Sequence, residues 1–127
     1  MLVVTDGFLH LQGVYYLRID EHPILCFEKR KTVKFVFEDL EMYGYEDEPI
    51  SAALHAAGID VLSRSPKHNR ARGFFCAIGN CSSCLMEVDG VPNVRVCTER
   101  LREGMVVRRQ SGRGVIAEPE DRGGHVL

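Results

Sequence analysis

The chain has 127 residues, of which 45% are hydrophobic and 27% charged, and its formal net charge is −2. This composition is typical of one globular domain and excludes an intrinsically disordered chain. No apolar run approaches the roughly 20 residues needed to cross a bilayer, and the first residues lack the basic and apolar regions of a secretory signal, so we expect a cytoplasmic protein without a membrane span.

The charges are unevenly distributed. Residues 38–60 hold seven acidic side chains and no Lys or Arg, whereas residues 64–113 hold ten Lys or Arg against four acidic side chains. Two solvated faces of opposite sign explain this pattern as well as a basic rim that steers a partner does. The near-neutral total argues against a nucleic-acid partner.

Two hairpins are predicted in the first 45 residues. Residues 8–11 and 14–17 flank Gln12-Gly13 and form a weak hairpin pattern. Residues 32–38 alternate strictly, which predicts a half-buried strand, and a strand around residues 42–45 would pair with it. The face of the first strand expected to be buried carries Val33, Phe35 and Phe37.

A helix is predicted next. Asp47 or Glu48 is expected to cap it, Pro49 suits its first turn, and Gly58 suits the position after its last residue. His55 falls off the apolar stripe, so we expect it to be exposed and not a ligand. The stripe itself consists of Ile50, Ala53, Leu54 and Ala57.

The remaining chain predicts strands separated by irregular segments. Residues 63–75 read as a long polar loop, residues 85–88 and 94–96 as a hairpin around Asp89-Gly90, and residues 104–108 as a last strand. Residues 111–127 are rich in Gly and charge and predict a tail. The order of elements predicts an α+β fold, a small mixed sheet with one main helix.

The cysteines carry the strongest chemical signal. Three of the five lie within nine residues, in the pattern Cys76-x4-Cys81-x2-Cys84, and twelve residues separate Cys84 from Cys97. This is the plant-type [2Fe–2S] spacing. A binuclear cluster takes two thiolates on each iron, so three of them must come from one curled segment, and the fourth returns after the predicted Asp89-Gly90 turn. Small residues that permit the curl are Ala77, Gly79, Ser82 and Ser83.

Other uses of these cysteines fit less well. Structural zinc favours two separated C-x2-C pairs, and only Cys81 and Cys84 form one. A [4Fe–4S] cluster favours a C-x2-C-x2-C run, and a dithiol site on this pair would leave Cys76 and Cys97 unexplained. The candidate cofactor-binding and metal-ligating residues are therefore Cys76, Cys81, Cys84 and Cys97, and no catalytic residue is predicted.

Residues near the cysteines allow more than one interpretation each. Phe74 and Phe75 either shield a cluster from water or are ordinary core aromatics. Cys26 is expected to be a small buried hydrophobe or an idle thiol. Three arginines either offset the charge of a reduced cluster, dock a partner or simply keep the protein in solution: Arg70, Arg72 and Arg95.

Four segments carry a resemblance to a known family: residues 18–25, 65–67, 72–84 and 92–97. Together they resemble the small [2Fe–2S] subunits of flavin-dependent amine and amino-acid dehydrogenase complexes. That family includes the small subunits of hydrogen cyanide synthase and of hydroxyproline or proline dehydrogenase, and the amino-terminal region of the sarcosine oxidase alpha subunit. The resemblance covers about residues 17–110.

The resemblance implies a β-grasp (ubiquitin-like), ferredoxin-like domain at residues 18–110, between an amino-terminal extension at residues 1–17 and a carboxy-terminal tail at residues 111–127. It also implies a chain that is not catalytic alone, and FAD on a larger partner subunit rather than on this chain. The sequence has no G-x-G-x-x-G or P-loop of its own. A free-standing [2Fe–2S] ferredoxin and a zinc-bearing interaction module are the alternatives.

Overall fold

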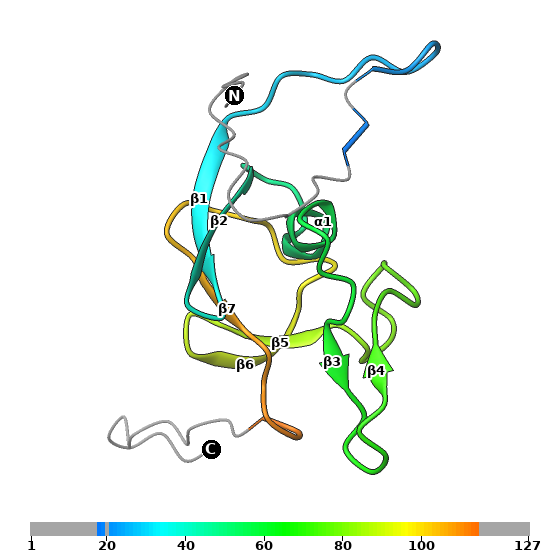
Figure 1. The fold of residues 1–127 in the computed structure, drawn as a ribbon, viewed down its shortest axis with the longest axis vertical. Helices are drawn as coiled ribbons and strands as arrows, with labels where there is room; N and C mark the ends of the chain where they lie inside the picture. Colours follow the sequence, from blue (N-terminus) through cyan, green and yellow to red (C-terminus); the bar gives the residue numbers. More distant parts are fainter. Residues whose placement is uncertain (1–17, 20, 115–127) are drawn as a thin grey trace, which may run out of the picture.

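The computed structural model describes residues 18, 19 and 21–114. The hairpin expected at residues 8–17, and all of the expected tail beyond Gly114, lie outside the described residues. Five strands form one mixed sheet in the order β2-β1-β7-β5-β6 (Figure 1). β1 and β7 run parallel at its centre, and the other neighbours are antiparallel. The predicted α+β class is confirmed.

The first two strands form as the alternation predicts. β1 (Thr32–Phe37) pairs antiparallel with β2 (Leu40–Tyr45). Val33, Phe35 and Phe37 point into the core and are almost completely buried. Because side chains alternate between the two faces of a strand, these three lie on the same face of the sheet. The helix of the domain covers that face.

The helix α1 (Ile50–Ala56) packs its predicted apolar stripe against the sheet, since Ile50, Ala53, Leu54 and Ala57 all belong to the hydrophobic core. Gly58 follows with φ +85°, in the left-handed conformation predicted for the helix end. None of the helices in the described ranges is long and apolar enough to span a membrane.

The predicted helix cap is wrong. The N-cap residue is Pro49, which makes no side-chain capping bond. The Glu48 carboxylate instead accepts two hydrogen bonds from the Arg18 guanidinium, at 2.9 and 2.7 Å, and one from the Tyr45 amide at 2.7 Å. A partner 30 residues away in sequence thus takes the carboxylate that local propensity assigned to the cap.

The loop expected at residues 63–75 contains a short antiparallel ribbon, which corrects the prediction. β3 (Ser63–Arg64) pairs with β4 (Ala71–Arg72). The Ser65 side chain closes the turn, because its oxygen accepts the Arg70 amide at 3.0 Å. Two-residue strands made by backbone bonds leave no hydrophobic period to read in the sequence.

The last three strands confirm their predictions with shifted ends. β5 (Leu85–Val88) and β6 (Val91–Arg95) form the expected hairpin, and β7 (Val106–Arg108) lies within the last predicted strand. Asp89 and Gly90 both have positive φ, at 50° and 81°. This two-residue turn fits the twist of the flanking strands and brings the residues at their far ends close together.

Candidate metal centre

The loop between β4 and β5, residues 73–84, wraps around one sulfur. The Cys76 Sγ accepts backbone N–H groups from Ile78 at 3.5 Å, Asn80 at 3.3 Å and Cys81 at 3.3 Å. The curl needs left-handed backbone at Ala77, with φ 56°, and at Gly79, with φ 85°. The small residues that the sequence singled out thus include the two that turn the chain here.

Two of the four predicted ligands, Cys84 and Cys97, are buried. Cys84 precedes β5 and Cys97 follows β6, so the hairpin places them together, with the Val96 amide donating to the Cys84 carbonyl at 3.3 Å. Both cysteines belong to the hydrophobic core, with exposed fractions of 3% and 6%.

The surroundings of Cys76 and of Cys84 shift the pKa of the two thiols in opposite directions. The amides of Ile78 and Cys81 lower the pKa of Cys76 to about 6, because N–H groups stabilise the thiolate. Burial, together with the neighbouring thiols of Cys97 and Cys81, raises the pKa of Cys84 to about 11. A buried thiol of this kind gives up its proton when a metal cation takes the proton's place. Both environments therefore suit thiolate ligands of a metal centre.

Neighbouring cysteines also contribute to these pKa shifts. Cys81 helps to lower the pKa of Cys76, and Cys97 and Cys81 help to raise the pKa of Cys84. Among the residues that the structure describes, no three His, Cys, Asp or Glu side chains are grouped to hold a single metal ion. The structure places Cys84 close to the start of the segment that holds Cys97 and places Cys81 beside the Cys76 sulfur, and the assignment of all four as ligands remains a prediction from their spacing.

Three side chains that sequence reasoning did not assign support the loop. The Ser63 hydroxyl donates to the Ser83 carbonyl at 2.6 Å, between two of the cysteines. The Arg95 Nε donates to the Cys81 carbonyl at 3.1 Å, and Thr98 lies where a side chain at Gly79 would project. These contacts cross between elements far apart in the chain, so spacing alone gives no signal for them.

The structure distinguishes between several of the interpretations that the sequence left open. Phe75 is 85% exposed and Phe74 contacts His55 edge-on at the surface, so neither is a core aromatic. His55 is exposed, as predicted. Cys26 is exposed, which contradicts the buried alternative. Arg70 and Arg72 are exposed in and beside β4, and no contact joins their side chains to the cysteine loop in the described part of the chain.

Gly73 sets the course of the loop, and we expect Gly73→Ala to lower the cluster content of the purified protein by about half or more. A Cβ at Gly73 would lie 2.5 Å from the Asp60 carbonyl oxygen, a backbone atom that cannot rotate away. The chain must therefore shift just before Cys76, at a cost of about 1–3 kcal/mol. Iron analysis of the purified variant measures the effect.

Gly90→Ala is the matched control. It strains a left-handed residue, but the added Cβ meets nothing within 4 Å and lies in the turn far from the cysteine loop. Its iron content should equal that of the parent protein. Equal iron content in the Gly73 variant would show that the loop tolerates the shift.

Comparison with known proteins gives one family match. The model of the 2Fe-2S iron-sulfur cluster binding domain matches residues 30–112, which contain Cys76, Cys81, Cys84 and Cys97. This match and the sheet order agree with the expected ferredoxin-like fold.

Two curated relatives are hydrogen cyanide synthase subunits named HcnA. The chain is 39% identical over 66 residues to the one from Pseudomonas aeruginosa, which covers 52% of this chain and 62% of that subunit. It is 31% identical over 72 residues to the one from Pseudomonas protegens, which covers 57% and 68%. The chain therefore spans only about two thirds of these subunits.

One solved structure is also similar, L-proline dehydrogenase from P. horikoshii. The TM-score is 0.61 at 31% identity, over 73% of this chain and 18% of that one. In that protein the matching region is thus a small part of a much longer polypeptide.

Proposed function

The chain belongs to the 2Fe-2S iron-sulfur cluster binding domain family, and from this premise we propose that it is the electron-transfer subunit of a larger flavin-dependent amine or amino-acid dehydrogenase. In this proposal Cys76, Cys81, Cys84 and Cys97 are the ligands. Substrate is oxidised at an FAD on another chain, and this chain relays single electrons in the reducing environment of the cytoplasm, where thiols stay available to a metal.

The observation that carries the proposal is the family match over residues 30–112, and the surroundings of three of the four cysteines support it. One sulfur sits in a cage of three backbone amides, and two others lie in the hydrophobic core under the β5–β6 hairpin. A [2Fe–2S] cluster supplies one-electron redox chemistry when bound. The chain's own part is to hold the thiolates, and its amides at Cys76 would favour the reduced state by stabilising negative charge.

In this proposal the two buried cysteines and the two cysteines of the loop have different roles. Cys84 and Cys97 exclude water because they belong to the core. Cys76 and Cys81 lie in a loop that is open to solvent, so electrons enter and leave over that loop. Ile78 is 68% exposed there and Phe75 even more so. Large apolar side chains beside a redox centre favour contact with another protein.

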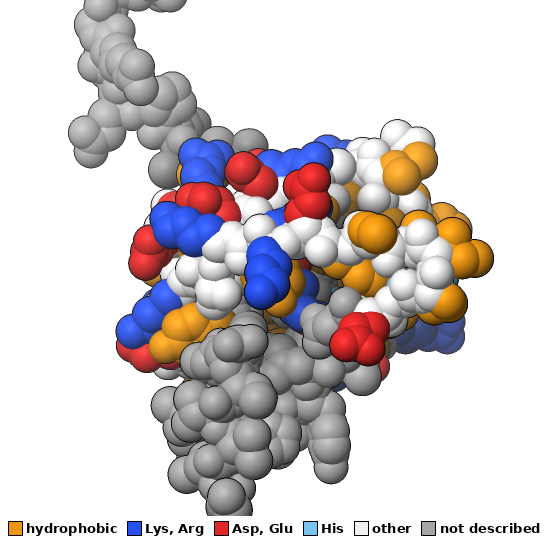
Figure 2. Space-filling view, turned by 90° about the horizontal axis from the view of Figure 1, so that it is seen from above, with side chains coloured by type: hydrophobic (Ala, Val, Ile, Leu, Met, Phe, Trp, Pro, Cys, Tyr) orange, Lys and Arg blue, Asp and Glu red, His pale blue; other side chains and the backbone are white. Residues whose placement is uncertain are grey.

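A second apolar segment supports a partner. Residues 21–31 run above the sheet without regular structure (Figure 1), and Ile24, Leu25 and Phe27 are exposed on them. Just before this segment in the sequence, Arg18 forms an ion pair with Glu48. Figure 2 shows that, on the face seen from above, hydrophobic side chains gather at one end and charged side chains at the other. Apolar area of this kind is expected to be covered in a complex.

The relatives favour a dehydrogenase as the complex. Two are named as subunits of hydrogen cyanide synthase, and the third is a chain of L-proline dehydrogenase. The matching region is 18% of that longer chain, and in this proposal a larger subunit accompanies the chain here. The proposed domain boundaries at residues 18 and 110 remain a prediction.

Affinity purification from the native source tests the function. We expect a larger FAD-containing chain to co-elute, and an amine or amino acid such as proline to reduce the iron centre in the complex but not in the isolated chain. A chain that elutes alone, with a stable cluster and without flavin, would instead identify a free-standing ferredoxin.

A further inference from the structure

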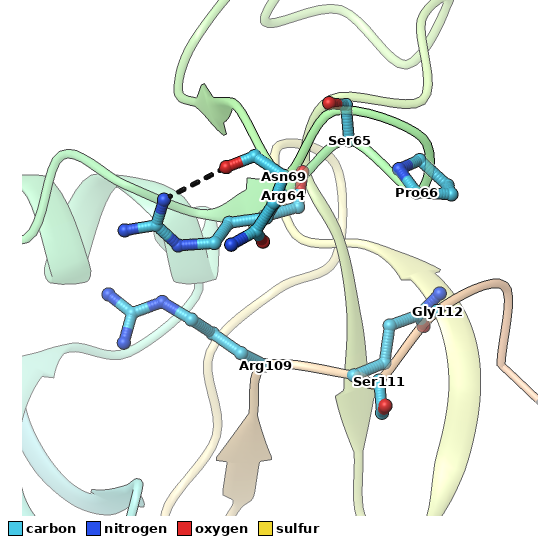
Figure 3. A pocket seen from close by; sticks show the side chains of 9 residues that line it. Arg64, Ser65, Pro66, Asn69, Arg109, Ser111 and Gly112 are labelled. Carbon is cyan, nitrogen blue, oxygen red and sulfur yellow. Dashed lines mark hydrogen bonds between the residues drawn. The ribbon is translucent and has the colours of Figure 1, made fainter.

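A pocket of about 310 Å³ lies beside the cysteine loop but does not include it. One wall consists of residues 63–66 and Asn69 of the β3–β4 ribbon, and the other of residues 109–112, where the chain leaves β7 (Figure 3). The lining contains hydroxyl, amide and guanidinium groups and no acidic side chain. It therefore offers hydrogen-bond donors and positive charge to a ligand.

Two arginines set the charge of this pocket. Figure 3 shows the side chains of Arg64 and Arg109 extending toward the same side, one from each wall. The Arg64 Nη1 donates to the Asn69 carbonyl at 3.1 Å, and Arg109 donates twice to the Val61 carbonyl, at 2.9 and 2.7 Å. Arg109 also lies over the Phe37 ring, 5.0 Å from its centre. Backbone carbonyls and a ring thus fix both guanidinium groups in place.

These two charges are not balanced within the described residues, where neither arginine forms an ion pair. The nearest carboxylate contact is that of Glu38, which accepts the backbone amide of Arg109 rather than its guanidinium. Each guanidinium has five N–H donors, and the carbonyl contacts use only some of them. The remaining donors are the groups that bind carboxylates best.

We propose that this pocket docks an acidic segment of the electron-transfer partner, with a Glu or Asp carboxylate between Arg64 and Arg109. The inference rests on the proposed function and names the chemistry of the partner's surface. The volume suits one or two side chains rather than a large cofactor. Exposed cations on the same ribbon extend the complementary charge around it: Lys67, Arg70 and Arg72.

The pocket is joined to the electron-transfer loop by one residue. Ser63 lines the pocket, and its hydroxyl donates to the Ser83 carbonyl at 2.6 Å, within the cysteine loop. A carboxylate bound here therefore fixes the partner next to the open end of the site. Such a contact orients the partner and speeds its encounter at low salt.

The probe is a blocked peptide of three Glu-Ala repeats, titrated into the full-length oxidised protein. Binding is followed through the NMR signals of the arginine Nε–H groups. We expect saturable shifts of Arg64 and Arg109, and Arg64→Gln should weaken binding about tenfold, since it removes a charge-assisted contact. Lys67→Gln is the matched control, because it removes one charge from the same ribbon outside the lining, and it should change binding less than about twofold.

A peptide of Gln-Ala repeats and inorganic phosphate complete the test. Neither should compete with the acidic peptide at equal concentration. The inference is overturned if the acidic peptide does not bind, if both arginine and lysine variants weaken it equally, or if phosphate alone binds. The titration follows the arginine signals and does not depend on the iron. A protein that has a normal cluster but does not bind the peptide therefore refutes this inference without contradicting the proposed function.

Discussion

Cys97→Ser is expected to yield a protein with about a tenth or less of the parent's iron and acid-labile sulfide, because a buried ligand would be lost. Cys97 lies in the core near Cys84 and contributes to the raised pKa of that thiol. Water cannot easily replace the missing thiolate there, and serine is a poor substitute because its hydroxyl stays protonated near neutral pH. Iron and sulfide analysis of the purified variant measures the loss.

Cys26→Ser is the control for this experiment. Cys26 is exposed, and it is a free cysteine outside the loop and the hairpin that hold the other four. Its replacement should leave the iron and sulfide content unchanged. A Cys97 variant with full iron content would remove this residue from the ligand set, and a Cys26 variant without iron would bring that residue into it.

Glu48→Ala is expected to lower the free energy of unfolding by about 2–4 kcal/mol, since it removes the hydrogen bonds that this buried carboxylate accepts from Arg18 and from the Tyr45 amide. The Glu48 side chain is only 6% exposed and accepts hydrogen bonds from both Arg18 and the Tyr45 amide. Arg18 also lies over the Tyr45 ring, 4.2 Å from its centre. The change therefore removes the contacts that join Arg18 to the turn before α1.

Glu41→Ala, on strand β2, is the matched control. Its ion pair with Lys34 is just as short, 2.7 Å, but both side chains are largely exposed. Exposed pairs contribute about 0–1 kcal/mol. Urea unfolding followed by circular dichroism compares the two variants, and we expect the midpoint to fall by roughly 1–2 M for Glu48→Ala only. Equal midpoints would mean that the Arg18 contact adds no stability.

Much of this fold is written in periodic patterns. The alternation at residues 32–38 predicted which face of β1 is buried, and the stripe from Ile50 to Ala57 predicted the packed face of α1. Asp89-Gly90 predicted its turn, because few residues accept two successive positive φ angles. In each case the physical cause acts between residues close in sequence, so the sequence displays it.

Most of the features that escaped prediction depend on distant partners, and one is a local ribbon without a side-chain pattern. Glu48 was expected to cap the helix, yet Arg18 binds it from 30 residues away. The β3–β4 ribbon is built from backbone bonds and a serine side chain, which leave no pattern. The spacing of the cysteines indicated the ligands, but not that Ser63 and Arg95 would hold the loop through its carbonyls. Such contacts exist only once the chain has folded.

The most direct test of the central claim is spectroscopy of the purified protein, with absorption and low-temperature EPR recorded before and after reduction by dithionite. The account predicts a brown protein that bleaches on reduction, two irons and two sulfides per chain, and a spin-half EPR signal in the reduced state only. A colourless protein that also fails anaerobic reconstitution with iron and sulfide, or one that contains zinc instead, would contradict the claim that these four cysteines hold a [2Fe–2S] cluster.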